Sequence, residues 1–259
     1  MAKHAIILCG GKATRLGGKI KGLIEIPNDK SIFYPGKPKR PPTIIELQIN
    51  RLAQGGVDCV WLATQHGAWT YRKWLGEYGD SLPIPVDIID EKVPLGTGGA
   101  IKHSIQSILD RRVFKKDRWF FIYNGDIVHN DDTLVARMLS VANSNFIGHN
   151  NCLAGYEVPA SQATQYGQIE IDDIFRVKAF KEKQHSDVPV WINAGLYLFD
   201  KSRILGYKKE KFSIERDYFE PHPQWNYMMP MREGSKWLDV GTEERLQELK
   251  TYGEEYAGI

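Results

Sequence analysis

Short apolar runs alternate along this chain with segments in which apolar residues recur at helical spacing. Residues 5–9 (AIILC) form an apolar run that stops at two glycines, which is typical of a buried strand. Residues 43–53 carry apolar side chains every three or four positions, and we expect Thr43 to cap this helix. Further strands are expected at 58–64, 86–90 and 119–123, and further helices at 69–78, 98–109 and 133–142.

The alternation of expected strands and helices changes after about residue 150. Residues 168–171 and 177–180 are typical of a hairpin, residues 190–199 are typical of a longer strand, and a last helix begins at Thr242. Strands and helices in repeated order predict right-handed crossovers and a mostly parallel sheet. The pattern therefore predicts a single α/β domain over residues 1–259, whose second half elaborates the first.

Composition narrows the class of protein further. Apolar residues make up 42% and charged residues 25% of the chain, which excludes a disordered or fibrous protein. The net charge of +2 (34 − 32) gives no reason to expect a nucleic-acid partner. No apolar run approaches the ~20 residues that a membrane helix needs, so no membrane partner is expected. Three widely spaced cysteines argue against a disulfide framework and predict a reducing, cytoplasmic location.

A glycine-rich turn follows the first expected strand directly, in residues 9–22 (CGGKATRLGGKIKG). Glycines allow backbone N–H groups to approach an anion closely, and such turns bind phosphates. Arg15 and Lys21 would add fixed and mobile positive charge. The spacing fits neither the Walker A pattern nor the G-x-G-x-x-G fingerprint, and a flexible basic loop is the alternative interpretation.

Acidic side chains stand after other expected elements. Asp126 ends an Asn-Gly-Asp run at the carboxyl end of the 119–123 strand, and Asp239 precedes the last helix. Open α/β sheets bind ligands outside the carboxyl ends of their strands, and carboxylates beside phosphate-binding loops are suitable Mg²⁺ ligands. As alternatives, Asp126 would serve turn chemistry and Asp239 would neighbour the cap of the last helix. A second glycine-rich turn, residues 91–101 (EKVPLGTGGAI), again lies between a strand and a helix.

The ordered set of motifs resembles the sugar-1-phosphate nucleotidyltransferase family from Ala5 to about Leu249. The motifs are GG-x-x-T-R-L, PLGTGGAI, NGD, YG, EK, NAG, S-I-E-R-D and W-L-D-V-G-T. One of them by itself is a weak signal, whereas their order is specific. The resemblance is strongest to the compact branch of heptose- and mannose-1-phosphate guanylyltransferases, since the chain has no hexapeptide repeat.

The chain departs from the family pattern near the first turn. Ala13 stands where the family usually has Gly, and Gly22 stands where it usually has Pro or Ala. The short spacing of Arg15 and Lys21 looks like that of the molybdenum-cofactor guanylyltransferases, which share the fold but lack the PLGTGGAI and W-x-D-V-G-T segments. Residues 27–42 form a basic, Pro-rich insertion, which we interpret as a lid over the triphosphate or as a solvated loop.

The resemblance implies a Rossmann-like, mixed and mainly parallel sheet with helices on both faces. It implies transfer of a nucleoside monophosphate from a nucleoside triphosphate to a sugar 1-phosphate, with Mg²⁺ as cofactor and release of pyrophosphate. Residues of about 1–130 would form the nucleotide-binding half, and residues of about 131–259 the sugar-phosphate-binding half. Because the attacking phosphate is already an anion, the chemistry needs positioning and charge neutralisation rather than a general base. A homodimer is allowed but not required.

The resemblance also implies functions for individual residues. Those implied in nucleotide binding are Cys9, Gly10, Gly11, Lys12, Pro94, Gly96, Thr97 and Gly98. Those implied in catalysis are Arg15, Lys21 and Asp126, and the implied metal ligands are Asp126 and Asp239. Those implied in sugar-phosphate binding are Gly125, Gly167, Glu182, Lys183 and Asn193.

Guanine is the base that we expect. Residues 94–100 are built from small side chains, which would leave room for a two-ring base. Members of the family that take dTTP or UTP typically have Gln at the position of Gly99, and this chain does not. Cytidylyl- and uridylyltransferases with similar glycine turns keep a pyrimidine as the alternative.

Some of these residues also have a purely structural interpretation. Lys183 would be a solvated charge, and residues 193–195 would be a bulge without a ligand. Ser213 is expected to cap a helix in which Glu215 favours the dipole, so we interpret residues 213–217 as structural, with lining of the sugar pocket as the alternative. For the whole chain the alternatives are transfer to a non-sugar phosphate, as in molybdopterin-cofactor enzymes, and a non-catalytic nucleotide-sugar sensor.

Overall fold

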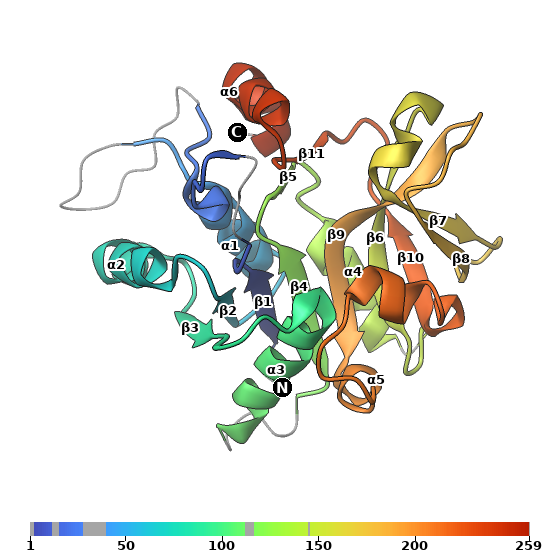
Figure 1. Ribbon diagram of the computed structural model, residues 1–259, viewed down its shortest axis with the longest axis horizontal. Coiled ribbons are helices and arrows are strands. Elements are labelled where there is room, and N and C mark those ends of the chain that lie inside the picture. The colour runs from blue at the N-terminus through green and yellow to red at the C-terminus, as the bar shows by residue number, and fades with distance from the viewer. Residues whose placement is uncertain (1–2, 12–15, 28–39, 112–116, 145, 259) are drawn as a thin grey trace.

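The computed structural model of the protein describes residues 3–11, 16–27, 40–111, 117–144 and 146–258. Helices pack against both faces of a central sheet (Figure 1). The strands of its main path lie in the order β10-β6-β9-β4-β1-β2-β3, and β7 and β8 branch from β9. This arrangement confirms the α/β class and the mixed, mainly parallel sheet expected from the sequence.

Four strands of the first half pair in parallel. They are β1 (His4–Leu8), β2 (Cys59–Thr64), β3 (Val86–Asp90) and β4 (Trp119–Asn124). In this register His4 lies beside Cys59 on one neighbour and beside Phe120 on the other. The connecting helices are α1 (Ile44–Gln54), α2 (Ala68–Tyr78) and α3 (Gly96–Asp110), so each expected strand and helix of this half is confirmed within a few residues.

The second half extends the sheet with a reversed strand. β9 (Val190–Asp200) runs antiparallel to β4 on one side and to β6 (Asn151–Val158) on the other, and β10 (Asn226–Pro230) pairs in parallel with β6. The expected hairpin is confirmed as β7 (Gly167–Ile171) and β8 (Val177–Glu182). A separate ribbon pairs β5 (Ile127–His129) with β11 (Trp237–Asp239).

Two apolar layers hold the helices on the sheet. The first lies under α1, α2 and α4 (Leu134–Asn143) and includes Ile45, Trp74 and Met138. The second lies under α3 and α5 (Lys201–Leu205) on the other face and includes Ile105 and Phe212. The last helix, α6 (Glu243–Ala257), packs in a smaller third cluster near β5. Among the described residues, none of the helices is both long and apolar enough to cross a bilayer.

Four strands were not expected from the sequence pattern. β5 and β11 have three residues each, which is too short for a readable alternation. β6 contains Gly155, and β10 ends in Pro230, and both residue types weaken a strand signal. These four segments form strands because they pair with residues far along the chain, and not because of the preferences of their own residues.

The helix cap expected at Thr43 is confirmed and is stronger than the pattern indicated. The Thr43 hydroxyl accepts from the Glu46 N–H, and the Glu46 carboxylate accepts from the Thr43 N–H at 2.7 Å. Arg40, at the end of the expected insertion, is also bound to Glu46, at 2.9 Å between Nη1 and Oε2. Residues 28–39 of that insertion lie outside the described residues, so the lid interpretation stays a prediction.

Candidate active site

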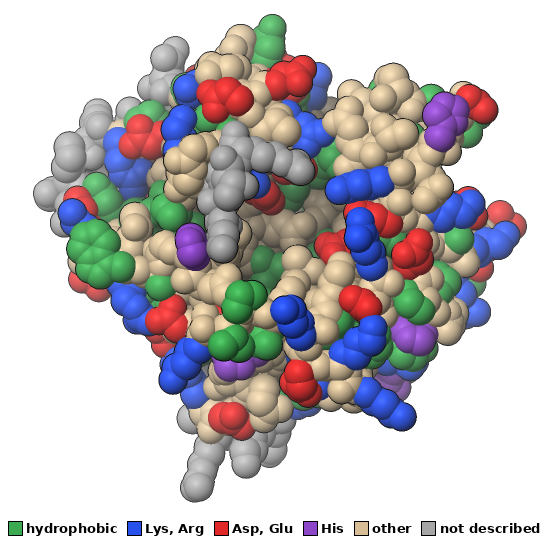
Figure 2. All heavy atoms as spheres, in the orientation of Figure 1, with side chains coloured by type: hydrophobic (Ala, Val, Ile, Leu, Met, Phe, Trp, Pro, Cys, Tyr) green, Lys and Arg blue, Asp and Glu red, His purple; other side chains and the backbone are tan. Residues whose placement is uncertain are grey.

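A cavity of about 420 Å³ opens where β1 and β4 end. The two glycine-rich turns and the turn after β4 contribute to its lining, and the face in Figure 2 is hollowed between the two halves of the chain. Of the expected site residues, those lining this cavity are Cys9, Gly10, Gly11, Lys21, Pro94, Gly96, Thr97, Gly125 and Asp126. Lys12 and Arg15 lie outside the described residues.

Gly125 sets the position of the turn that carries Asp126. Its N–H donates to the Leu8 carbonyl at 3.1 Å. A Cβ at this position would lie 2.7 Å from the same carbonyl oxygen. Only glycine therefore lets the turn approach β1 closely enough to place Asp126 beside the first glycine-rich turn.

Lys21 reaches this turn from the other side of the cavity. Its Nζ lies 2.8 Å from Oδ2 of Asp126. The family departure at Gly22 has a packing reason, because a Cβ there would lie 2.5 Å from Ile45 Cγ2 and 2.7 Å from the Tyr71 hydroxyl oxygen. Gly22 thus lets the segment of Lys21 sit directly on α1 and α2.

The β5–β11 ribbon brings Asp239 to Asp126. Asp239 pairs with Ile127 across the ribbon, and the N–H of Val240 donates to the Asp126 carbonyl at 2.8 Å. Burial and the nearby charge of Asp126 raise the pKa of Asp239 to about 6, although Arg245 binds its Oδ2 at 3.0 Å. The two carboxylates therefore repel each other at the edge of the cavity.

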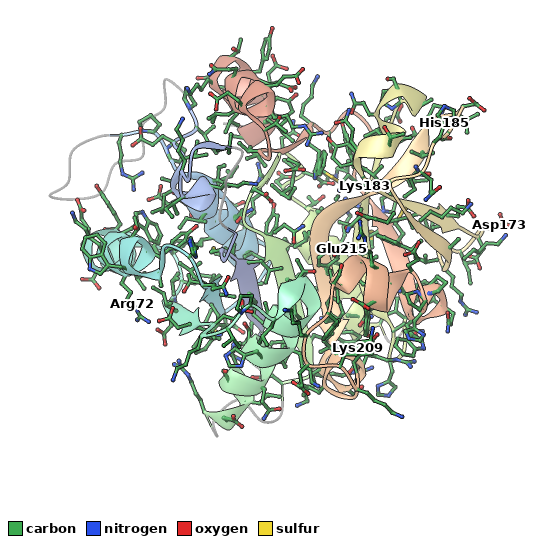
Figure 3. All side chains as sticks on the ribbon, viewed as in Figure 1. Arg72, Asp173, Lys183, His185, Lys209 and Glu215 are labelled. Carbon is green, nitrogen blue, oxygen red and sulfur yellow. The ribbon has the colours of Figure 1, made fainter. Side chains whose placement is uncertain are left out.

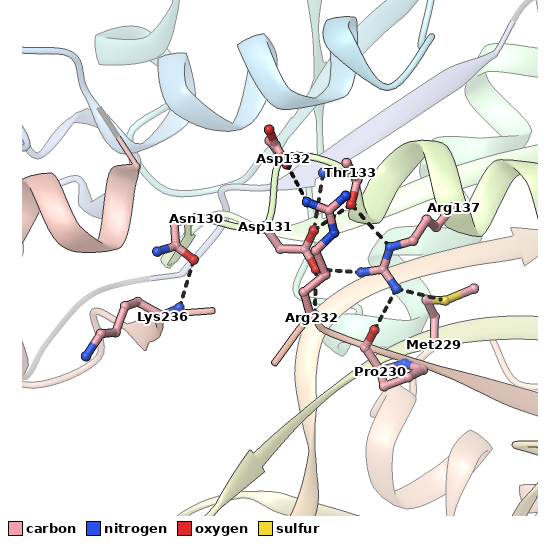
Figure 4. Close-up of polar contacts among 9 residues, drawn as sticks. All are labelled: Asn130, Asp131, Asp132, Thr133, Arg137, Met229, Pro230, Arg232 and Lys236. Carbon is pink, nitrogen blue, oxygen red and sulfur yellow. Dashed lines mark hydrogen bonds and ion pairs between the residues drawn. The ribbon is translucent and has the colours of Figure 1, made fainter. Parts of the chain in front are cut away.

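A polar network around the buried Asp131 carboxylate holds the chain that leads into β11 (Figure 4). The Asp131 carboxylate accepts from the Arg232 N–H at 2.9 Å and pairs with Arg137 at 2.5 Å. The Lys236 N–H donates to the Asn130 side-chain oxygen at 2.8 Å. These contacts join the segment after β5 to the segment before β11, so that the ribbon carrying Asp239 stays in register with β5.

Four of the residues expected to bind the sugar phosphate lie in the second half, whereas Gly125 lines the cavity. Gly167 and Glu182 face each other in the β7–β8 register, and burial raises the pKa of Glu182 above its usual range. Lys183 follows with a left-handed φ of 56°, and its Nζ lies 3.6 Å from Glu182 Oε1. The charge of Lys183 partly opposes the burial and Asp126 charge that raise the pKa of Asp239, which places Lys183 within electrostatic reach of the cavity edge.

Asn193 lies at an irregularity in β9. The register with β6 shifts between Leu153 and Gly155, where Gly155 pairs with Asn193 and Leu153 with Tyr197, so the strand is irregular after Asn193. The side-chain amide of Asn193 donates to the Tyr197 hydroxyl at 2.8 Å, and its oxygen accepts from the Gly195 N–H. A ligand role for Asn193 stays a prediction.

Two glycines of the second glycine-rich turn pack against a segment that is distant in sequence. The N–H of Gly98 donates to the Phe212 carbonyl at 3.0 Å, and a Cβ on Gly98 would lie 2.1 Å from the Phe212 ring. A Cβ on Gly99 would lie 2.3 Å from the Glu210 carbonyl oxygen. The small residues at 98 and 99 therefore accommodate the 210–212 segment, and Gly98 is not part of the cavity lining. Packing against residues 210–212, and not room for a two-ring base, requires glycine at positions 98 and 99.

Two buried polar side chains near the cavity were not among the expected site residues. Gln48 of α1 donates to backbone carbonyls on both sides of the turn that carries Asp126. The Tyr71 hydroxyl is hydrogen-bonded to the backbone of Gly22, next to Lys21. The sequence held one signal for Gln48. It is a polar residue at a position where the helical spacing predicts an apolar, buried side chain.

One family of known proteins matches nearly the whole of this chain. The family model described as "Nucleotidyl transferase" matches residues 4–255. The chain belongs to this nucleotidyl transferase family. The shared region thus includes both glycine-rich turns, the Asp126 turn and the β5–β11 ribbon.

Several members of the nucleotidyl transferase family are similar in sequence. The mannose-1-phosphate guanylyltransferase of Mycobacterium tuberculosis is 27% identical over 254 residues, which cover 94% of this chain and 63% of that protein. The D-glycero-alpha-D-manno-heptose 1-phosphate guanylyltransferase of Campylobacter jejuni is 31% identical over 213 residues, with 82% of this chain and 83% of that protein covered. The chain spans about three fifths of the length of the mannose-1-phosphate relatives.

Solved structures of the nucleotidyl transferase fold agree with this one. HddC from Yersinia pseudotuberculosis matches 98% of this chain with a TM-score of 0.74 at 24% identity. The structure of HddC complexed with GMP-PN matches the same share with a TM-score of 0.71 at 25% identity. The expected Rossmann-like nucleotidyltransferase fold is therefore confirmed.

Proposed function

We propose that this protein transfers the guanylyl group of GTP to a sugar 1-phosphate and releases pyrophosphate. The observation that carries the proposal is the convergence of Asp126, Asp239 and Lys21 at the edge of a cavity lined by Gly10 and Gly11. The residues come from distant parts of the chain, and they combine carboxylates, a cation and backbone donors. Phosphoryl transfer needs this set of groups.

The proposed reaction joins two polyanions. An oxygen of the sugar 1-phosphate attacks the α-phosphorus of GTP, and the bond from that phosphorus to the β-phosphate oxygen breaks. The backbone of Gly10 and Gly11 would cradle the departing phosphates, with Lys12 and Arg15 as the further cationic groups of that turn. Lys21, held 2.8 Å from Asp126, would place its charge where the attacking and α-phosphate oxygens meet.

The chemistry of the two carboxylates fits a Mg²⁺ ion. Burial, and after it the nearby charge of Asp126, raises the pKa of Asp239 to about 6. A divalent cation would relieve this repulsion, and Mg²⁺ prefers one or two carboxylates with substrate phosphate oxygens. When bound, the ion would neutralise charge on the reacting phosphates. Among the described residues no group of three or more His, Cys, Asp or Glu side chains is arranged to hold a metal ion, so substrate oxygens and water would complete the shell.

The two halves of the chain would divide the substrates. The cavity lining comes from residues 8–126, which supports a nucleotide-binding half of about 1–130. Gly167, Glu182, Lys183 and Asn193 come from residues 131–259, which supports a sugar-phosphate-binding half, and Gly125 lies between them. The names of relatives support the substrates, since they act on mannose 1-phosphate and on a heptose 1-phosphate, and HddC was solved with GMP-PN.

Pyrophosphate release tests the proposal directly. The purified protein is incubated with Mg²⁺, a panel of sugar 1-phosphates that includes mannose 1-phosphate, and GTP, ATP, CTP, UTP or dTTP. We expect release with GTP and loss of release on chelation of Mg²⁺. A pyrimidine nucleotide favoured tenfold, about 1.4 kcal/mol, would overturn guanine but keep the reaction class. Binding of nucleotide sugars without any release would favour the sensor.

A further inference from the structure

Glu215 is held between the two halves of the candidate site. It stands in the short π-helix Ile214–Phe219, which begins after β9 and α5 in the second half. The Thr97 hydroxyl, from the second glycine-rich turn, donates to Glu215 Oε2 at 3.1 Å. The Ser213 hydroxyl donates to the same oxygen at 2.7 Å. The other oxygen, Oε1, has no hydrogen-bond partner in the described part of the chain.

The segment around Glu215 is fixed to the second glycine-rich turn by its backbone. The N–H of Ile214 donates to the Thr97 hydroxyl at 2.9 Å. The Phe212 carbonyl accepts from Gly98 at 3.0 Å. Glu215 is therefore not a mobile surface charge, because one of its carboxylate oxygens and the backbone N–H of the preceding residue are both bound to Thr97, which lines the cavity.

Glu215 also lies within electrostatic reach of Glu182, which is expected to contact the sugar. Burial, and after it the charge of Glu215, raises the pKa of Tyr197, whose hydroxyl accepts from Asn193 at 2.8 Å. The same charge also opposes ionisation of Glu182, in addition to the effect of burial. Figure 3 places Glu215 and Lys183 on the edge of the second half that is turned toward the first half.

We propose that Glu215 binds the sugar directly, with Oε1 accepting a hydrogen bond from a hydroxyl of the sugar ring or its side chain. The proposal rests on the proposed function and deepens it. An anchored, half-buried carboxylate with one unused oxygen is a hydrogen-bond acceptor whose orientation is set before substrate arrives. Because Glu182 presents a second carboxylate nearby, the substrate class is a neutral sugar 1-phosphate with free hydroxyls. A uronic acid 1-phosphate would add a third negative charge and be rejected.

Two variants on the same helix test this role. Glu215→Ala removes the proposed acceptor, whereas Asp217→Ala removes a carboxylate that binds Lys209 and the Ser213 N–H. With the sugar 1-phosphate that gives the fastest pyrophosphate release, we expect Glu215→Ala to raise the KM for this sugar by about 10- to 100-fold and the KM for GTP by less than about threefold. Asp217→Ala should lower thermal stability with less than a threefold change in either KM. Equal effects of both variants on the sugar KM would assign Glu215 a purely structural role.

Deoxy sugars identify the contact itself. Each monodeoxy analogue of that sugar 1-phosphate is compared in wild type and Glu215→Ala. For the hydroxyl that binds Glu215, the loss of kcat/KM seen in wild type should disappear in the variant, and additive losses at every hydroxyl would overturn the contact. Calorimetry measures the affinity of wild type and of Glu215→Ala for mannose 1-phosphate. This affinity tests the Glu215 contact separately from the proposed transferase activity. If wild type releases no pyrophosphate with any pair of substrates, the proposed function fails, whereas release without a Glu215 effect overturns only the present inference.

Discussion

The side-chain amide of Gln48 donates a 2.8 Å hydrogen bond to the backbone carbonyl of Ile127. The same amide nitrogen donates to the Asn124 carbonyl at 2.9 Å. Gln48 thus bridges the two ends of the turn that carries Gly125 and Asp126, from a helix position that is only 1% exposed. Gln48 therefore supports the turn at the cavity edge, although its buried side chain cannot touch a substrate.

Gln48→Met should therefore impair Asp126 as well as the fold. The variant keeps the side-chain volume but removes the donor that both carbonyls share, which should lower the free energy of unfolding by about 2–4 kcal/mol. We also expect a several-fold rise in the Mg²⁺ concentration that gives half-maximal pyrophosphate release, because the turn is no longer held in place.

Asn226→Leu is the matched control for Gln48→Met. Asn226 is also buried, and its amide donates to the carbonyls of His222 and Pro223, away from the cavity. It should lose comparable stability with an unchanged Mg²⁺ requirement. If both variants change the Mg²⁺ requirement equally, Gln48 has no particular role in positioning Asp126.

Asp126→Asn and Asp239→Asn should each lower turnover by about 10²–10³-fold, or roughly 2.7–4 kcal/mol of transition-state stabilisation. Stability should change little, because Asn relieves the repulsion that raises the pKa of Asp239. Steady-state kinetics at saturating Mg²⁺ and thermal melting measure the two effects. Wild-type turnover in either variant would remove that carboxylate from the set of metal ligands.

Gly98→Ala should destabilise the protein, because the new Cβ would lie 2.1 Å from the Phe212 ring. Overpacking of this kind costs about 1–3 kcal/mol. Gly76→Ala in α2 is the control, since a Cβ there meets no atom within 4 Å. In a helix interior this change should stabilise by about 0.5–1 kcal/mol. Urea unfolding of both variants distinguishes packing against Phe212 from a general intolerance of larger residues.

Asp131→Asn should show a pH-dependent loss of stability. Burial would raise the pKa of Asp131, but the Arg232 N–H and the Arg137 charge outweigh it, so its pKa lies below the usual value. The ionised carboxylate therefore stabilises the fold above the unfolded pKa of about 3.9, and this contribution disappears as pH falls through the lower folded pKa. Removal of one partner of a buried pair costs about 3 kcal/mol at pH 7. Urea unfolding at pH 7, 5 and 3 should show the two proteins converging at the lowest pH; a constant difference would contradict this linkage.

Lys183→Ala should weaken sugar-phosphate binding by about tenfold, or 1.4 kcal/mol, and nucleotide binding much less. Lys183 stands at the end of β8 beside Glu182 and within reach of Asp239. Lys181→Ala is the control, since Lys181 pairs with Glu170 on the exposed surface of the hairpin. Calorimetry with each substrate alone measures both affinities. Equal loss for both substrates would move Lys183 to the centre of the site.

Local sequence patterns were sufficient for the first half of the molecule. The apolar run before Gly10 and the capped helix after Thr43 depend on neighbouring residues, whose spacing and caps can be read directly. The Asp126 turn was also predictable, because the carboxyl end of a buried strand has a known direction in a parallel sheet. The reversal of β9 between β4 and β6 was not, since pairing direction is decided by partners far along the chain.

The amino-acid sequence by itself determined the strand–turn–helix units and the chemical types of the site residues, because short-range sterics and hydrophobic spacing encode them. Only the tertiary structure decided that Asp239 lies beside Asp126, through a three-residue strand too short to recognise. It also decided that Gly98 accommodates Phe212 and that Glu215 hydrogen-bonds Thr97. These relationships depend on close packing between segments that are distant in sequence, and such packing leaves no periodic signal in either segment.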